Sequence, residues 1–105
     1  MELTPQEAAE RLQSGNADLI DVREPYEFEA GRIEGARLVP LLELTEFAQT
    51  ADPERPLVFV CRVGGRSAMA TMAFRRAGFN AYNLAGGVLA WERSGLPFTG
   101  SVADH

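Results

Sequence analysis

The chain has 105 residues, 46% of them hydrophobic and 24% charged, which is typical of one globular domain and excludes disordered and fibrous classes. Its ten basic residues are all arginine, and fifteen acidic residues bring the net charge to -5. This balance argues against binding to nucleic acid or to an anionic membrane, and no apolar run approaches the roughly 20 residues of a membrane helix.

The first half of the chain predicts helices that alternate with short strands. Thr4-Pro5-Gln6-Glu7 is a capping box with proline at the first helical position, so we expect a helix that reaches about Ser14. Gly15-Asn16 would end this helix, because both residue types tolerate the backbone conformation found after helix C-termini. The next elements expected are a strand over residues 18–22, a short helix over 24–30 ended by Gly31, a strand over 36–40 and a helical stretch over 41–50.

Residues 57–60 are apolar at all four positions and form the clearest strand signal in the sequence. An apolar run of this length favours a strand that is covered on both faces, as in a parallel sheet. The remaining elements expected are a helix over residues 67–77, a strand over 80–84 and a helix over 88–94. The alternation of strands and helices predicts an α/β fold with a short, mainly parallel sheet flanked by helices.

The helix expected over residues 67–77 has a full set of end signals. Arginines occupy its last turn and Gly78 follows it, which suits the left-handed conformation after a helix C-terminus. Phe79 is then placed to contact Phe74 one turn back. These features together predict a Schellman motif at the end of the helix.

The single cysteine, Cys61, lies directly after the buried strand and directly before a glycine-rich loop. Ligands bind at the carboxyl ends of strands in open α/β sheets, and loop amides with a helix N-terminus favour an anion there. The same dipoles favour a thiolate, and the arginines and glycines after Cys61 argue against the usual role of a lone cysteine as a small buried hydrophobe. We therefore interpret Cys61 as a functional, catalytic thiolate. A single cysteine also excludes an intrachain disulfide and a cysteine-rich zinc site.

The loop after Cys61 is expected to bind an anionic substrate. Two of its residues are arginines that add fixed positive charge, and its glycine pair allows the positive φ that curling around a sulfur demands. Asp21 and Arg23 are interpreted as a structural ion pair at a strand end, near the site. The candidate substrate-binding residues are Arg62, Val63, Gly64, Gly65, Arg66 and Ser67.

Three segments of the chain resemble one known family. The loop Cys61-Arg62-Val63-Gly64-Gly65-Arg66-Ser67 resembles the active-site loop of single-domain rhodaneses, the thiosulfate sulfurtransferases. Residues 21–36 (DVREPYEFEAGRIEGA) resemble the family's N-terminal motif, and residues 84–97, with Leu84-Ala85-Gly86-Gly87-Val88 and Trp91, resemble its C-terminal motif. We expect a rhodanese-like domain over residues 1–98 and a frayed C-terminal tail over residues 99–105.

The resemblance implies five short parallel strands, the first within residues 1–3, and a ping-pong transfer of sulfur. Cys61 would attack the outer sulfur of thiosulfate, release sulfite and become a persulfide. A thiophilic acceptor, cyanide or a cellular thiol, would then take that sulfur. The resemblance implies no metal or organic cofactor. Arg32 and Glu34 stand where the family often has histidine and proline, a departure that bears on donor preference.

Three alternatives to a general sulfurtransferase remain at this point. A phosphatase or arsenate reductase with a Cys-x5-Arg loop would need arginine six positions after cysteine, whereas Arg66 is five positions after Cys61. A non-catalytic interaction module on the same fold normally lacks the loop cysteine that this chain has. A persulfide carrier dedicated to one partner protein would share the first half of the reaction.

Several other residues are expected to have structural or solvent-exposed roles. We expect Trp91 and Phe98 to lie in the core or in a pocket wall, and Met69 and Met72 to pack in the core. The chain begins without the basic segment and apolar stretch of a secretory signal, so we expect a soluble cytoplasmic domain. The residues expected in solvent are the terminal His105 and the acidic cluster Glu24, Glu27, Glu29 and Glu34, which could face a basic partner.

Overall fold

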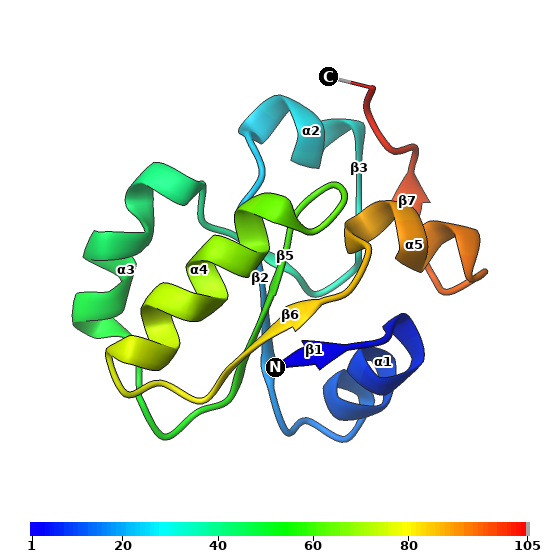
Figure 1. The fold of residues 1–105 in the computed structure, drawn as a ribbon. Coiled ribbons are helices and arrows are strands. Elements are labelled where there is room, and N and C mark those ends of the chain that lie inside the picture. The colour runs from blue at the N-terminus through cyan, green and yellow to red at the C-terminus, as the bar shows by residue number, and fades with distance from the viewer. Residues whose placement is uncertain (105) are drawn as a thin grey trace.

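A five-stranded sheet forms the centre of the computed structural model, which describes residues 1–104 (Figure 1). The strand order is β1-β6-β5-β2-β4, and every neighbouring pair in this sheet is parallel. The prediction of a short parallel sheet flanked by helices is therefore confirmed. The strands are β1 (Glu2–Leu3), β2 (Asp18–Asp21), β4 (Arg37–Leu38), β5 (Leu57–Val60) and β6 (Ala81–Leu84).

Two layers of helices cover the two faces of the sheet. Figure 1 shows α3 and α4 together on one side of the strands, with α1 and α5 on the other. The stretch expected as one helix over residues 41–50 starts as a 3-10 turn, η1 (Leu41–Glu43), before the α-helix begins. The helices are α1 (Pro5–Gln13), α2 (Pro25–Ala30), α3 (Leu44–Thr50), α4 (Gly65–Arg76) and α5 (Gly87–Arg93).

Strand β5 contributes side chains to both cores, as its uninterrupted apolar sequence predicts. Val58 and Val60 pack in the cluster that contains residues of α1 and α5. Phe59 packs in the other cluster, together with Ala70 and Phe74 of α4. Because side chains alternate across a strand, Cys61 continues the second set and faces the α4 side of the sheet.

The helix-end signals in the sequence form the expected structures. The Thr4 hydroxyl accepts from the Glu7 amide at 3.1 Å, and the Glu7 carboxylate accepts from the Thr4 amide at 2.9 Å. At the end of α4 the Phe79 amide donates to the Phe74 carbonyl at 2.9 Å, and their ring centroids lie 4.9 Å apart. The capping box and the Schellman motif are therefore both confirmed.

A second, two-stranded sheet was not predicted from the sequence. Strand β3 (Gly31–Arg32) pairs antiparallel with β7 (Thr99–Gly100), and Val102 packs against the α1 and α5 core. Residues 99–104, expected to be a frayed tail, are held in the structure by this pairing and by the Ser101 amide, which donates to the Ala30 carbonyl at 3.0 Å. His105, expected to be a solvated end, lies outside the described residues.

Among residues 1–104, no helix has both the length and the apolar character to cross a membrane.

Candidate active site

The loop after Cys61 curls around the sulfur of this residue, which is 1% exposed. The Gly64 amide donates to Cys61 Sγ at 3.1 Å, the Ser67 hydroxyl at 3.3 Å and the Ser67 amide at 3.5 Å. Gly64 adopts a φ of 112°, which a side chain at this position would strain. Of the glycine pair expected to provide positive φ, only Gly64 does so, because Gly65 is the first residue of α4.

The position of Cys61 favours a negative charge on its sulfur. Helix α4 begins at Gly65, two residues earlier than predicted, so its N-terminal amides lie directly behind the loop. Hydrogen-bond donors and a helix N-terminus stabilise an anion more than a neutral thiol. The arrangement can therefore hold a thiolate before reaction and a thiolate leaving group afterwards.

A second glycine-rich turn, between β6 and α5, packs against the loop after Cys61. The Val88 amide donates to the Cys61 carbonyl at 2.8 Å, and the Leu89 amide donates to the Arg62 carbonyl at 3.1 Å. Gly87 has a φ of 67°, and a Cβ there would overlap the Arg62 carbonyl. From the sequence, this glycine pair stood out only as part of a resemblance, although its position between a strand and a helix, like that of the loop after Cys61, was a usable signal.

Asn83 of β6 also holds the loop after Cys61 in place. Its side-chain amide donates to the Gly64 carbonyl at 3.3 Å and to the Glu2 carboxylate at 2.9 Å. Asn83 is buried, and its Oδ1 has no hydrogen-bond partner within residues 1–104. Sequence reasoning missed this residue, although a polar side chain in an apolar strand was a usable signal.

Glu27 takes part in the site, which its sequence context did not predict. This residue was expected on a solvated face, but it is 3% exposed and forms a bidentate ion pair with Arg66 at 2.8 and 3.0 Å. The hydrogen bonds from Arg66 lower the pKa of Glu27 against the opposing effect of burial, and the same bonds raise the pKa of Arg66. The other members of the expected solvated cluster are exposed: Glu24, Glu29 and Glu34.

Both loop arginines, expected to bind an anionic substrate, have partners within the protein. Arg66 binds Glu27, while Arg62 Nε donates to the Ala103 carbonyl at 2.9 Å and its Nη2 lies 3.9 Å from Asp104. Their side chains remain 36% and 24% exposed, respectively. Each guanidinium is thus held in place beside the loop with part of its surface open to solvent.

Asp21 and Arg23 form the structural ion pair expected at the end of β2. Both side chains are fully buried, and Arg23 Nη2 lies 2.8 Å from the Asp21 carboxylate. Arg23 also donates to the Glu27 carbonyl at 3.3 Å and to the Gly31 carbonyl at 2.8 Å. This network fixes the end of α2 and so fixes the position of Glu27 relative to the loop.

The expected core residues divide into two groups. Trp91 is buried, with its indole N–H donating to the Pro97 carbonyl at 2.8 Å, and Phe98 packs partly buried against the same core. The prediction for these two aromatic residues is confirmed. The prediction for Met69 and Met72 is wrong, because they are 65% and 55% exposed. Ala70 and Phe74 form the buried face of α4, so the two methionines lie on its outer face.

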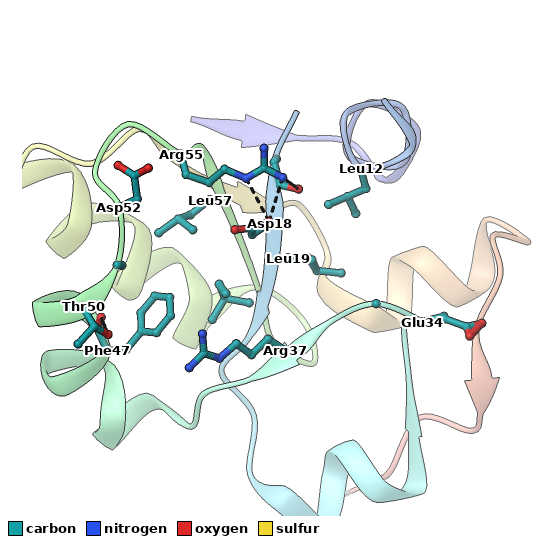
Figure 2. A pocket seen from close by; sticks show the side chains of 14 residues that line it. Leu12, Asp18, Leu19, Glu34, Arg37, Phe47, Thr50, Asp52, Arg55 and Leu57 are labelled. Atoms are coloured by element: carbon teal, nitrogen blue, oxygen red, sulfur yellow. Dashed lines mark hydrogen bonds and ion pairs between the residues drawn. The ribbon is translucent and has the colours of Figure 1, made fainter. Parts of the chain in front are cut away.

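A cavity of about 510 Å³ lies at the opposite end of the strands from Cys61. Figure 2 shows it beside the first residues of β2 and β5, Asp18 and Leu57, whereas Cys61 follows the last residue of β5. The strand length separates the two places by about 13 Å. Arg55 at the cavity rim pairs with Asp18 at 3.0 Å and donates to the Gly15 carbonyl at 2.8 Å. The cavity is therefore a separate feature that does not adjoin the loop after Cys61.

Comparisons with known proteins match most of the chain. The family model for the rhodanese-like domain matches residues 4–94. The chain is 36% identical over 87 residues to thiosulfate sulfurtransferase GlpE from Pseudomonas aeruginosa, covering 82% of this chain and 79% of GlpE. A rhodanese-related protein from Thermoplasma volcanium has a TM-score of 0.86 and 26% identity, covering 93% of this chain and 96% of that one.

A longer relative contains the same domain within a larger protein. The chain is 39% identical over 99 residues to the probable adenylyltransferase/sulfurtransferase MoeZ from Mycobacterium tuberculosis. The alignment covers 90% of this chain and 25% of MoeZ, so the chain spans about a quarter of that relative's length.

Proposed function

The chain belongs to the rhodanese-like domain family, and from this membership we propose that it transfers sulfane sulfur from thiosulfate to a thiophilic acceptor through a persulfide on Cys61. The observation that carries the proposal is the convergence of three hydrogen-bond donors on the sulfur of the only cysteine. A thiolate held in this way is a nucleophile suited to sulfur chemistry.

The first half-reaction forms the persulfide. The Cys61 thiolate attacks the outer sulfur of thiosulfate, a new S–S bond forms, and the original S–S bond breaks with its electron pair leaving on sulfite. Arg62 and Arg66 supply positive charge for the dianionic donor and for the leaving sulfite. Because Glu27 engages Nη1 and Nη2 of Arg66, the orientation of that guanidinium is set before the donor arrives.

The second half-reaction returns the enzyme to its starting form. An acceptor thiolate or cyanide attacks the outer sulfur of the persulfide, and the electron pair of the breaking S–S bond returns to Cys61. Cys61 is now the leaving group, so the Gly64 and Ser67 donors that stabilise its thiolate lower the barrier of this step as well. Charge and atoms balance in both halves without a metal or an organic cofactor.

The acceptor distinguishes a general enzyme from a dedicated carrier. Discharge to many small thiols would characterise a general sulfurtransferase. A persulfide that only one protein can discharge would characterise a carrier. MoeZ, by its name, combines sulfurtransferase with adenylyltransferase activity, which supports a protein acceptor as the alternative.

The proposal is tested by measuring thiocyanate formation from thiosulfate and cyanide beside hydrolysis of an aryl phosphate. We expect thiocyanate formation, no aryl phosphate hydrolysis, and an intact mass raised by one sulfur atom after thiosulfate treatment. The variant Cys61→Ser should retain the fold, judged by circular dichroism, and lose both thiocyanate formation and the mass increase. Aryl phosphate hydrolysis faster than thiocyanate formation in the unmodified protein would contradict the assignment.

A further inference from the structure

The outer face of α4 is an exposed apolar surface that begins at the catalytic loop. Met69 and Met72 lie on this face, and Val63 of the loop is also exposed, at 56%. Methionine side chains are flexible and polarisable, and they occur often on surfaces that bind other proteins. Apolar side chains gathered beside a reactive group indicate a contact surface more than isolated exposed residues do.

A groove with no charged residue in its wall runs along this face. It has a volume of about 390 Å³ and lies between α4 and the segment formed by η1 and α3, which Figure 1 shows next to each other. Its first residue along α4 is Met69, two positions after Ser67, and Ser67 contacts Cys61. The groove therefore leads away from the reactive sulfur. It is lined mainly by Leu41, Leu44, Ala48, Met69, Ala73 and Ala77.

The charge of this face is opposite to that of the whole protein. The chain carries a net charge of -5, yet residues 55–91 contain no aspartate or glutamate. Helix α4 carries Arg66, Arg75 and Arg76 instead. Arg76 is exposed and forms no ion pair within residues 1–104. Arg75 donates to the Ala81 carbonyl at 2.6 Å and lines a second hollow with Glu2, on the other flank of α4. Within the described residues, Arg76, four residues after Met72, is therefore the unpaired positive charge on the outer face of the helix.

We propose that the outer face of α4, with the groove beside it, docks an acidic sulfur-acceptor protein. An apolar side chain of the partner occupies the groove, and a carboxylate of the partner lies against Arg76. The inference rests on the proposed function, because docking matters for transfer only when Cys61 carries a persulfide. The partner's thiolate attacks the outer sulfur, the S–S bond breaks, and the electron pair returns to Cys61.

A protein acceptor explains why a buried sulfur would have an exposed apolar face beside it. Cys61 is 1% exposed, so an acceptor thiol has to enter in a restricted direction. A partner bound on α4 would hold its thiol near the loop and convert an encounter between two molecules into an event within one complex.

A second copy of the chain fits this face less well than an acidic partner. Two copies that met through α4 would each present arginines and no carboxylate from residues 55–91. Charge complementarity therefore favours an unlike, acidic protein.

Two synthetic peptides test the surface directly. One has leucines flanked by glutamates and a single terminal cysteine, and the other has lysine in place of every glutamate. The acidic peptide should shift the amide signals of Met69, Ala73 and Ala77 in the 15N-labelled protein, and this shift should weaken with added salt. Equal shifts with the basic peptide, or shifts confined to α1 and α5, would overturn the proposal.

Sulfur transfer to the acidic peptide then separates docking from chemistry. Met69→Glu and Arg76→Glu should each slow transfer from the Cys61 persulfide to this peptide about tenfold, the effect of one central interface residue. Both variants should keep normal turnover of thiosulfate with cyanide. Arg93→Glu, an equal charge reversal at an exposed position of α5, should leave both reactions unchanged.

The outcomes distinguish the two proposals. Unchanged peptide transfer in Met69→Glu and Arg76→Glu, with normal cyanide turnover, would overturn the docking surface alone. Absence of thiocyanate formation in the unmodified protein would overturn the sulfurtransferase assignment itself. A dimer in sedimentation experiments that Met69→Glu dissociates would assign the face to a second copy of the chain and overturn the acidic partner.

Discussion

Glu27 holds Arg66 through two hydrogen bonds of 2.8 and 3.0 Å, across 39 residues of sequence. The pair joins α2 to the first turn of α4, so it connects the segment after β2 with the loop that surrounds Cys61. The Glu27 carboxylate also accepts from the Glu24 amide at 2.9 Å, which fixes it within its own helix. The pair therefore sets the distance between two elements that flank the site.

Replacing Glu27 with glutamine should destabilise the protein. Glu27→Gln leaves Arg66 without its charged partner, and loss of a charged hydrogen bond at a buried residue costs about 1–3 kcal/mol. Denaturant unfolding of both proteins at neutral pH measures the change in free energy. Glu29→Gln, on the exposed side of the same helix, is the matched control and should stay within about 0.5 kcal/mol of the unmodified protein. Equal destabilisation by both variants would show that the ion pair contributes nothing specific.

The contribution of this pair should disappear in acid. Arg66 lowers the pKa of Glu27 in the folded protein below its ordinary value of 4.5, whereas the unfolded chain retains the ordinary value. The unfolded state therefore binds the proton first, and the stabilisation is present above the unfolded pKa and lost as pH falls through the folded one. The difference in unfolding free energy between the unmodified protein and Glu27→Gln should be constant near neutrality and shrink below about pH 4.5. A difference that grows in acid would contradict this assignment.

Gly87→Ala should displace the loop after Cys61 and destabilise the protein more than a glycine-to-alanine substitution at an open position. The new Cβ would overlap the Arg62 carbonyl, so the loop behind Cys61 has to move. Gly95→Ala is the matched control, because Gly95 has a similar φ of 78° with nothing within 4 Å of an added Cβ. We expect about 1–2 kcal/mol of backbone strain in the control and a larger loss in Gly87→Ala, together with reduced thiocyanate formation. Thermal unfolding and the thiocyanate assay check the two effects, and equal losses would show that the loop yields easily.

Arg62→Ala should raise KM for thiosulfate with little change in overall stability. Among the described residues, its guanidinium forms a hydrogen bond with Ala103 and an ion pair with Asp104. Both partners lie near the C-terminus, so few structural interactions are lost. Removing one charge-assisted contact to the donor should lower kcat/KM for thiosulfate about 5- to 150-fold. Arg66→Ala should lower both kcat/KM and stability, since it also leaves Glu27 unpaired. Unchanged thiosulfate kinetics in both variants would show that neither guanidinium meets the donor.

The sequence predicted those parts of the fold that depend on local patterns. The apolar run of β5 and the end of α4 at Gly78 and Phe79 could be read directly, because each rests on neighbouring residues. Strands β3 and β7 could not be predicted, since two residues carry no periodicity and their pairing joins positions 31–32 to 99–100. Patterns within a few residues were sufficient to predict single helices and strands, but not the pairing of β3 with β7.

The same limit explains what was missed in the site. Cys61 and its loop are contiguous in sequence, so their chemistry could be inferred from composition and order. Glu27 resembles its exposed neighbours, and only its burial against Arg66 distinguishes it. Met69 and Met72 have the spacing of a buried helix face, yet the alanine and phenylalanine residues of α4 fill the core instead.

The side of the sheet on which the Cys61 sulfur lies depends on whether the number of residues between it and Leu57 is odd or even. Strand β5 directs Leu57 and Phe59 toward α4, and Cys61 continues that alternation two positions later. Deleting or inserting one residue within β5 would turn the thiol toward α1 and α5, away from the donors of Gly64 and Ser67. The length of this one strand therefore fixes the face of the sheet on which the Cys61 thiol lies.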